Sequence, residues 1–305
     1  MKQILLTGAF SYSQKQIEDI EELGYQCYYM KDEAGKLNST FFSVEAIVCN
    51  GLFLYHDLSV FPQLKFIQLT SAGMDRVPLE RIRERGIVLK NARGVYSKPM
   101  AEWAIMQVLE HYKRASFFVK HQKEKKWEKE RTLREVVGAQ VAIIGAGSVG
   151  EEVAKRFKAF EAKVVGFDPI ATTSLWFDDI RDVKELPQQI SNFDIVVLTA
   201  PLTADTHHLM SYPLLSSMKS NTILVNIARG ALIDTDALIK VLKERSDLYA
   251  ALDVFEEEPL PVNSPLWTLP NVSVSPHNSF ISDGNNERMF KVIYQNLKNF
   301  IAQNK

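Results

Sequence analysis

The chain has 305 residues, of which 46% are hydrophobic and 24% charged, and its 36 basic and 37 acidic residues nearly cancel. Such a length is typical of about two domains, and the charge balance argues against nucleic acid or an anionic membrane as the main partner. The two cysteines, Cys27 and Cys49, are too few for a disulfide framework or a thiolate metal site.

The chain shows no secretory or membrane-spanning pattern. Its opening run KQILLTGAF predicts a strand, and no apolar run reaches the roughly 18 residues that a membrane helix needs. The histidines are scattered without ligand spacing, and each cysteine lies in a strand-like run. We expect a soluble cytoplasmic protein with buried free thiols and no metal site.

The first part of the chain predicts an α/β domain with a parallel sheet. A long helical pattern from Pro99 to Phe118 follows it, and then a charged arm that carries Trp127. Within the first part, runs typical of strands alternate with helical patterns near 14–23 and 78–85; the strand-like runs lie at 4–6, 25–30, 46–49, 66–69 and 87–89.

The stretch from Val141 to Asp168 predicts a complete βαβ unit with a dinucleotide-binding fingerprint. Gly145 makes the turn off the strand, Gly147 lets a diphosphate approach the backbone, and Gly150 lets the helix pack close to the sheet. The N-terminus of the helix that begins near Ser148 faces the anion. Asp168 ends the second strand, where a carboxylate accepts hydrogen bonds from ribose hydroxyls and repels a 2′-phosphate, so NAD is favoured over NADP.

The position of this unit in the chain predicts an inserted domain. Strand-like runs continue at 194–199, 222–228, 248–254 and 271–275, and Ser282 to Gln303 predicts a terminal amphipathic helix. We expect two Rossmann-like, doubly wound parallel-sheet α/β domains with a cleft between them. A flavodoxin-like substrate domain (1–98) is interrupted by an NAD-binding domain (99–282), and the helix of 283–305 returns to the first domain.

Three ionisable residues follow successive strands of the second domain. Arg229 follows NIA, Glu258 lies beyond ALDVF, and His277 follows SVSP, so parallel strands bring all three to one edge. A cation, a carboxylate and an imidazole beside a nicotinamide are what hydride transfer to a keto acid requires. The alternatives are a surface ion pair for Arg229, a solvated acidic turn for Glu258, and a structural histidine at 277. His207 and His208 are expected to pack at the surface or at the cofactor edge.

The motifs resemble those of the D-isomer-specific 2-hydroxyacid dehydrogenases over nearly the whole chain. The shared stretches are SAG-D at 71–75, AE at 101–102, the glycine unit, T-PLT at 199–203, N-ARG at 226–230, ALDVFEEEPLP at 251–261 and SPH at 275–277. The resemblance implies that Arg229 binds the substrate carboxylate, that His277 is the acid/base and that Glu258 is its partner. It also implies a carboxylate site on the backbone of Ser71, Ala72 and Gly73, and a cofactor site that includes Ser148, Val149, Thr199, Ala200, Pro201, Thr206, Ile227, Ala228 and Asp253, the last at the nicotinamide amide.

The activity that the resemblance implies is the NAD-dependent interconversion of a small 2-keto acid and its D-2-hydroxy acid, of the glyoxylate or hydroxypyruvate reductase type. It also implies a homodimer formed through the helix from Pro99 and the arm that follows. The alternatives are an NAD-sensing corepressor-like protein and a phosphoglycerate dehydrogenase. A formate dehydrogenase is disfavoured, because members of that group carry glutamine in place of Glu258. A phosphite dehydrogenase, in contrast, is compatible with the Arg229, Glu258 and His277 triad.

Two departures from the family pattern stand out. Asn278-Ser279-Phe280 follows His277 where the family has a glycine two places on, which leaves the shape of that loop open. The run from Asn50 to Leu54 lacks the arginine that phosphoglycerate dehydrogenases carry there. A phosphorylated substrate would lack a charge-assisted clamp in this loop, so 3-phosphoglycerate is expected to be a poor substrate.

Overall fold

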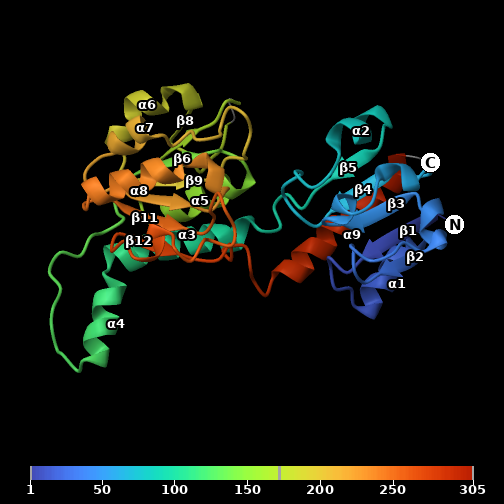
Figure 1. The fold of residues 1–305 in the computed structure, drawn as a ribbon, viewed down its shortest axis with the longest axis horizontal. Helices are drawn as coiled ribbons and strands as arrows, with labels where there is room; N and C mark the ends of the chain where they lie inside the picture. The colour runs from blue at the N-terminus through green and yellow to red at the C-terminus, as the bar shows by residue number, and fades with distance from the viewer. Residues whose placement is uncertain (1, 171–172, 304–305) are drawn as a thin grey trace. The chain divides into compact units, whose positions relative to one another are not determined.

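The computed structural model describes residues 2–170 and 173–303 and divides into two compact units. Unit 1 comprises the residues up to Tyr96 together with those from Ser282 onward, and unit 2 runs from Ser97 to Ile281 (Figure 1). In the described residues, no helix is both long enough and apolar enough to cross a bilayer.

Unit 1 is a parallel five-stranded sheet with the order β2-β1-β3-β4-β5, which is the flavodoxin-like arrangement. The C-terminal helix α9 (Asn285–Gln303) packs on it through Met289, Ile293, Leu297 and Phe300, whose spacing places them on one helix face. The strands and the other α-helices of unit 1 are β1 (Lys2–Thr7), α1 (Gln14–Glu22), β2 (Tyr25–Met30), β3 (Ala46–Cys49), β4 (Phe66–Leu69), α2 (Leu79–Glu84) and β5 (Val88–Lys90).

Unit 2 is a parallel seven-stranded sheet with the order β12-β11-β10-β9-β6-β7-β8. The order reverses at β6, so the first strand of the glycine unit stands at the topological switch point where doubly wound sheets bind ligands. The strands are β6 (Gln140–Ile144), β7 (Lys163–Phe167), β8 (Asp179–Arg181), β9 (Ile195–Leu198), β10 (Ile223–Asn226), β11 (Tyr249–Leu252) and β12 (Val272–Val274), and the helices are α3 (Ser97–Tyr112), α4 (Ala115–Lys123), α5 (Ser148–Ala159), α6 (Leu186–Gln189), α7 (Tyr212–Ser216) and α8 (Thr235–Glu244).

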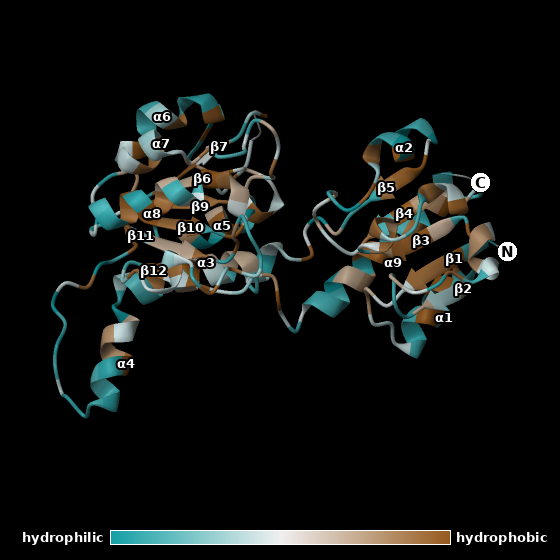
Figure 2. Cartoon of the chain, in the orientation of Figure 1, coloured by the Kyte–Doolittle hydropathy of each residue, from teal (hydrophilic) through white to brown (hydrophobic). Residues whose placement is uncertain are grey.

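Successive residues of the central strands belong to two different cores. In β6, Val141 and Ile143 join the cluster that contains α3 and α5, whereas Ala142 and Ile144 join the cluster that contains α7 and α8. A parallel strand buried on both faces is apolar without alternation, which explains its continuous apolar run. Figure 2 shows central strands of both sheets, such as β1, β3 and β6, in the hydrophobic colour. The predicted two-sheet α/β fold is confirmed.

The single helix expected from Pro99 to Phe118 is wrong, because the chain breaks after α3. Arg114 adopts a left-handed conformation with φ 52° before α4 begins. The chain returning from the arm explains the break: the N–H of Arg134 donates to the carbonyl of Tyr112 at 3.0 Å, and Lys113 Nζ donates to the carbonyl of Arg134 at 2.7 Å. These bonds satisfy groups at the end of α3, while α4 and the arm project from the rest of unit 2 (Figure 1).

The expected burial of both thiols holds for one of them. Both cysteines are free, but only Cys49 is buried, and Cys27 is half-buried in β2. Burial and, to a smaller extent, the charge of Glu21 raise the pKa of the Cys27 thiol to about 11, and burial raises the pKa of the Cys49 thiol well above its usual value. Neither thiol is therefore ionised at neutral pH, so both act as packing groups.

Candidate active site

The glycine loop after β6 is packed too closely for side chains at two of its three glycines. Gly145 has φ 103°, and a Cβ there would lie 2.7 Å from the backbone of Ala200. A Cβ on Gly150 would lie 2.0 Å from the carbonyl oxygen of Gly145, so α5 rests directly on the loop. A Cβ on Gly147 would meet no protein atom within 4 Å. Packing within the chain therefore does not require glycine at 147, and the close approach of a ligand remains the physical reason for it.

The groups around this loop suit a dinucleotide. The N-cap of α5 is Gly147, which has no side chain to cap the helix, so the first N–H groups of α5 can bind a phosphate. The hydroxyl of Thr199, at the end of β9, donates to the carbonyl of Gly145 at 2.7 Å and holds the loop in place. Asp168 follows β7 and accepts from the N–H of Ala146 at 2.8 Å and of Ile170 at 2.9 Å. This carboxylate therefore lies beside the glycine loop, where the ribose of a dinucleotide is expected.

The other predicted cofactor residues follow β9 and β10. Ala200, Ile227 and Ala228 are buried, with exposures of 8%, 1% and 6%. The hydroxyl of Thr206 donates to the carbonyl of Pro201 at 2.7 Å and closes the turn after β9. These residues thus lie at the ends of β9 and β10, in the loops that follow these strands.

The predicted catalytic residues follow three neighbouring strands. Arg229 follows β10, Glu258 follows β11 and His277 follows β12, and these strands are adjacent and parallel at one end of the sheet. Nδ1 of His277 lies 2.8 Å from Oε2 of Glu258. The other oxygen of Glu258 accepts from the N–H of Phe255 at 3.0 Å. The hydrogen bond to Glu258 leaves Nε2 as the ring nitrogen that can exchange a proton with a ligand.

The structure also distinguishes Glu258 from its neighbours in the acidic run. Glu256 contacts His208 and accepts from the N–H of Thr235 at 3.1 Å, so it is directed away from His277. Burial of Glu256 opposes ionisation, but the hydrogen bonds from Thr235 and His208 outweigh it and lower its pKa below the usual value. Glu256 is therefore an ionised carboxylate with partners of its own.

Asp253, at the end of β11, holds the loop of His277. It is completely buried, and its carboxylate accepts from the hydroxyl of Ser275, from the N–H of Asn278 at 2.8 Å and from the N–H of Ser279 at 2.9 Å. Its own carbonyl accepts from the N–H of His277 at 2.8 Å. The resemblance implied a nicotinamide contact for Asp253 but did not indicate this anchoring. The serine of SPH, with a hydroxyl two residues before the histidine, is the sequence signal that could have indicated it.

Arg229 is held by its own strand end. Its Nη1 donates to the carbonyl of Ala228 at 2.8 Å, while the amide of Asn226 donates to the carbonyl of Arg229 at 2.9 Å. The next residue, Gly230, lies against the backbone of Phe255, where a Cβ would come within 1.8 Å of a carbonyl carbon. This contact joins the segment of Arg229 to the one that bears Glu258. Asn226 was not among the predicted site residues, although its amide orders the strand end.

The predicted carboxylate-binding backbone belongs to unit 1 and follows β4. The carbonyls of this loop are bonded within unit 1: that of Ser71 accepts from the N–H of Ala92 at 2.9 Å, that of Ala72 from the Asn91 amide at 2.6 Å, and that of Gly73 from the Ser71 hydroxyl at 2.9 Å. With these acceptors engaged, the loop can offer N–H groups to an anion.

Comparisons with known proteins identify the family to which the chain is similar. A model of the NAD-binding domain of the D-isomer specific 2-hydroxyacid dehydrogenases matches residues 105–279. The chain is 34% identical over 244 residues to a glyoxylate reductase of Pyrococcus horikoshii, which covers 77% of this chain and 73% of that protein. It is also 34% identical over 241 residues to a D-3-phosphoglycerate dehydrogenase of Methanocaldococcus jannaschii, covering 77% of this chain and 45% of that protein.

A solved structure extends the similarity to both units. The D-lactate dehydrogenase from Aquifex aeolicus, complexed with NAD and lactic acid, has a TM-score of 0.77 at 25% identity and covers 98% of this chain and 96% of that one. The fold and the matched domain thus define a dinucleotide-binding α/β oxidoreductase. More particularly, the chain belongs to the D-isomer specific 2-hydroxyacid dehydrogenase family, as the motifs predicted. It is an NAD(P)-dependent oxidoreductase of that family.

Proposed function

We propose that the protein reduces a small, unphosphorylated 2-keto acid to its D-2-hydroxy acid with NADH, and catalyses the reverse reaction. The observation that carries this proposal is the His277–Glu258 pair, with 2.8 Å between Nδ1 and Oε2, on the same sheet edge as Arg229. The similarity to the glyoxylate reductase of Pyrococcus horikoshii supports a short keto acid as the substrate class.

The proposed chemistry divides among these side chains. Arg229 binds the substrate carboxylate and polarises the carbonyl, as a guanidinium can do with two parallel hydrogen bonds. His277 donates its Nε2 proton to the carbonyl oxygen as the carbonyl carbon receives hydride, and Glu258 stabilises the imidazolium through Nδ1. The bound dinucleotide supplies that hydride. In the reverse direction, neutral His277 accepts the hydroxyl proton at Nε2. The backbone of Ser71 to Gly73 is proposed to contribute N–H groups for anion binding.

The proposed cofactor is NAD in preference to NADP. Asp168 is held beside the glycine loop by the N–H groups of Ala146 and Ile170, so its negative charge lies where the 2′-position of the adenosine ribose is expected. Gly147 and the uncapped N-terminus of α5 would hold the diphosphate. Both cofactors carry the diphosphate, so the proposed discrimination depends on Asp168 and not on the glycine loop.

The decisive experiment is turnover of NADH with a panel of keto acids. The panel includes glyoxylate, hydroxypyruvate, pyruvate, bulkier branched and aromatic acids, and 3-phosphohydroxypyruvate. We expect turnover with at least one unphosphorylated acid, and a loss of about 10² to 10⁴ in kcat for His277→Ala. NADH binding without turnover of any acid would contradict the enzyme assignment, and 3-phosphohydroxypyruvate as the best substrate would contradict the substrate class.

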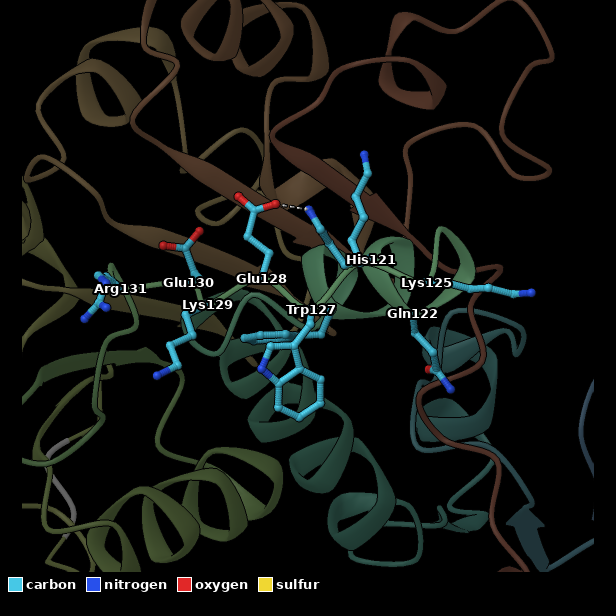
Figure 3. Close-up of a pocket in the computed structure, with 10 residues that line it drawn as sticks. His121, Gln122, Lys125, Trp127, Glu128, Lys129, Glu130 and Arg131 are labelled. Carbon is cyan, nitrogen blue, oxygen red and sulfur yellow. Dashed lines mark hydrogen bonds and ion pairs between the residues drawn. The ribbon is translucent and has the colours of Figure 1, made fainter.

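We further propose a homodimer formed through the arm after α3. Trp127 in this arm is 98% exposed, and a hollow between α4 and the following segment is lined by Phe118, His121 and Trp127 (Figure 3). An indole that exposed is typical of a surface that a partner covers. Sedimentation of wild type and Trp127→Ala tests this, with a dimer expected for the wild type and a weakened one for the variant. The free thiols of Cys27 and Cys49 are consistent with the proposed cytoplasmic location.

A further inference from the structure

Three side chains with metal-binding groups meet on unit 2, although the sequence separates them. His207 and His208 lie in the loop after β9 and Glu256 lies after β11, and their ligand atoms are all within 4.8 Å of one another. Among residues 2–170 and 173–303, no other three histidine, cysteine or carboxylate side chains meet this criterion. We propose that His207, His208 and Glu256 form a binding site for a divalent transition-metal ion, with Zn²⁺ as the principal occupant.

The sequence-based expectation of no metal site rested on the spacing of the histidines alone. Two adjacent histidines lack a ligand spacing within their own segment, and the third ligand is 48 residues further on. Two imidazoles and one carboxylate are a ligand set that Zn²⁺ takes in proteins, with water in the fourth position. With two neutral imidazoles and one carboxylate, the complex of the Zn²⁺ ion carries a net charge of +1. The site is exposed, so water can solvate this charge.

The ligand atoms lie near one another, and binding one ion requires small shifts of each pair. Nε2 of His208 lies 2.5 Å from Oε1 of Glu256, and the rings of His207 and His208 are stacked with centroids 3.9 Å apart. Two ligand atoms on a tetrahedral zinc ion lie about 3.3 Å from each other, given zinc–ligand bonds of about 2.0–2.1 Å. The His208–Glu256 pair must therefore open by roughly 0.8 Å, and His207 must approach by rotating its ring. His207 is exposed, so its ring can turn without disturbing the core.

The backbone around two of the ligands is already ordered. The N–H of Thr235, at the start of α8, donates to Oε2 of Glu256 at 3.1 Å and orients the carboxylate. The N–H of His208 donates to the carbonyl of Ala231 at 2.8 Å, which ties its loop to the segment after β10. Hydrogen bonds of this kind to ligands raise metal affinity because they reduce the ordering that binding must impose. The site is outside the Arg229, Glu258 and His277 triad, and the inference does not depend on the proposed reaction.

The site joins two segments that border the triad. Glu256 lies two residues before Glu258, whereas His207 and His208 continue the turn that Thr206 closes. An ion held by both segments would stabilise the folded protein, since it binds the native chain and the unfolded chain lacks the assembled site. Added Zn²⁺ is therefore expected to raise the melting temperature of unit 2.

Calorimetric titration of the EDTA-treated and desalted full chain with zinc chloride tests the proposal. We expect one high-affinity Zn²⁺ per chain, with affinity at least tenfold weaker in both His207→Ala and Glu256→Gln, and loss of the zinc-dependent rise in melting temperature in both. His121→Ala is the matched control, because His121 of α4 and Glu128 of the arm are a histidine–glutamate pair at 3.1 Å, remote in sequence from the proposed ligands (Figure 3). This control should bind Zn²⁺ like the wild type.

Three results of the titration would overturn the proposed zinc site. Absence of stoichiometric binding to the wild type would overturn the proposal. So would wild-type affinity in either His207→Ala or Glu256→Gln, or an equal loss of affinity in His121→Ala. His207 is exposed and Glu256 keeps its shape as glutamine, and melting curves without metal verify that both variants fold.

Discussion

Replacing Asp253 with asparagine tests whether this residue positions the catalytic histidine. In the wild type, one carboxylate oxygen accepts from Ser275 and from the N–H of Asn278, and the other accepts from the N–H of Ser279. An asparagine has one oxygen and one NH₂ group. In either orientation of the amide, at least one backbone N–H of the loop would face a donor and lose its acceptor.

The expected size of the effect follows from the burial of Asp253, which is 0% exposed. A hydrogen bond to a buried charged group contributes about 1.5–3 kcal/mol, so we expect Asp253→Asn to lower the free energy of unfolding by about 1.5–3 kcal/mol. The backbone of His277, whose φ of 51° lies in the left-handed region, would then be less well fixed, because the surrounding hydrogen bonds maintain this conformation. Misplacing a catalytic group by about 1 Å can reduce the rate by about 10²-fold, and we expect a decrease of that order in kcat.

The assay measures kcat and the KM for NADH in wild type, Asp253→Asn and Ser275→Ala, together with urea unfolding of each. Ser275→Ala removes one donor and leaves both backbone amides bonded, so its kcat should fall by less than about tenfold. In Asp253→Asn the KM for NADH should change by less than about threefold. A tenfold rise in that KM with kcat unchanged would refute this reasoning and would indicate that Asp253 acts by contacting the nicotinamide amide.

Three further predictions follow. The kcat/KM for NADH should exceed that for NADPH by at least about tenfold, or about 1.4 kcal/mol, because of Asp168; equal values would contradict its assigned role. In Glu258→Gln the imidazolium loses its counter-charge, so the alkaline limb of the pH profile for reduction should move to lower pH, and an unmoved limb would mean that another group partners His277. Burial against Tyr249, then the charges of Arg114 and Arg134, lower the pKa of His111 from 6.5 to about 4. As the pH falls, the unfolded chain therefore binds a proton at His111 before the folded chain does. The free energy of unfolding should decrease by about 1–2 kcal/mol between pH 6.5 and about 4, after allowing for solvent screening. Urea unfolding at pH 7 and 4.5 measures this loss, which His111→Phe should lack.

The elements that the sequence predicted well are those with strong local patterns. The bounds of β3 (Ala46–Cys49) and β4 (Phe66–Leu69) agree with the short apolar runs between polar turns. The positions of Arg229 and His277 were also predictable, because each follows a recognisable strand and parallel strands end at the same edge, whereas Glu258 was selected within its acidic run by the resemblance. In both cases the pattern lies within a few neighbouring residues.

The features that escaped prediction depend on contacts between distant parts of the chain. The break before α4 depends on Arg134, which returns to bond Tyr112. The edge strand β8 (Asp179–Arg181) contains only one apolar residue, and it forms because β7 offers it a partner. The pairing of His208 with Glu256 joins residues 48 apart, and no property of either local segment indicates it. Tertiary contacts override local pattern at each of these places.

The loop after β12 keeps its shape through bonds to backbone groups, although it lacks the glycine of the family pattern. The left-handed backbone in this loop falls on His277, and neither Asn278 nor Ser279 has a positive φ. Asp253 is bonded to the backbone N–H groups of these two residues, which every amino acid except proline provides. Neither position therefore needs glycine, and the departure from the family pattern at residue 279 is a neutral one. The geometry of this loop therefore depends on the buried carboxylate after β11 and not on small side chains after the histidine.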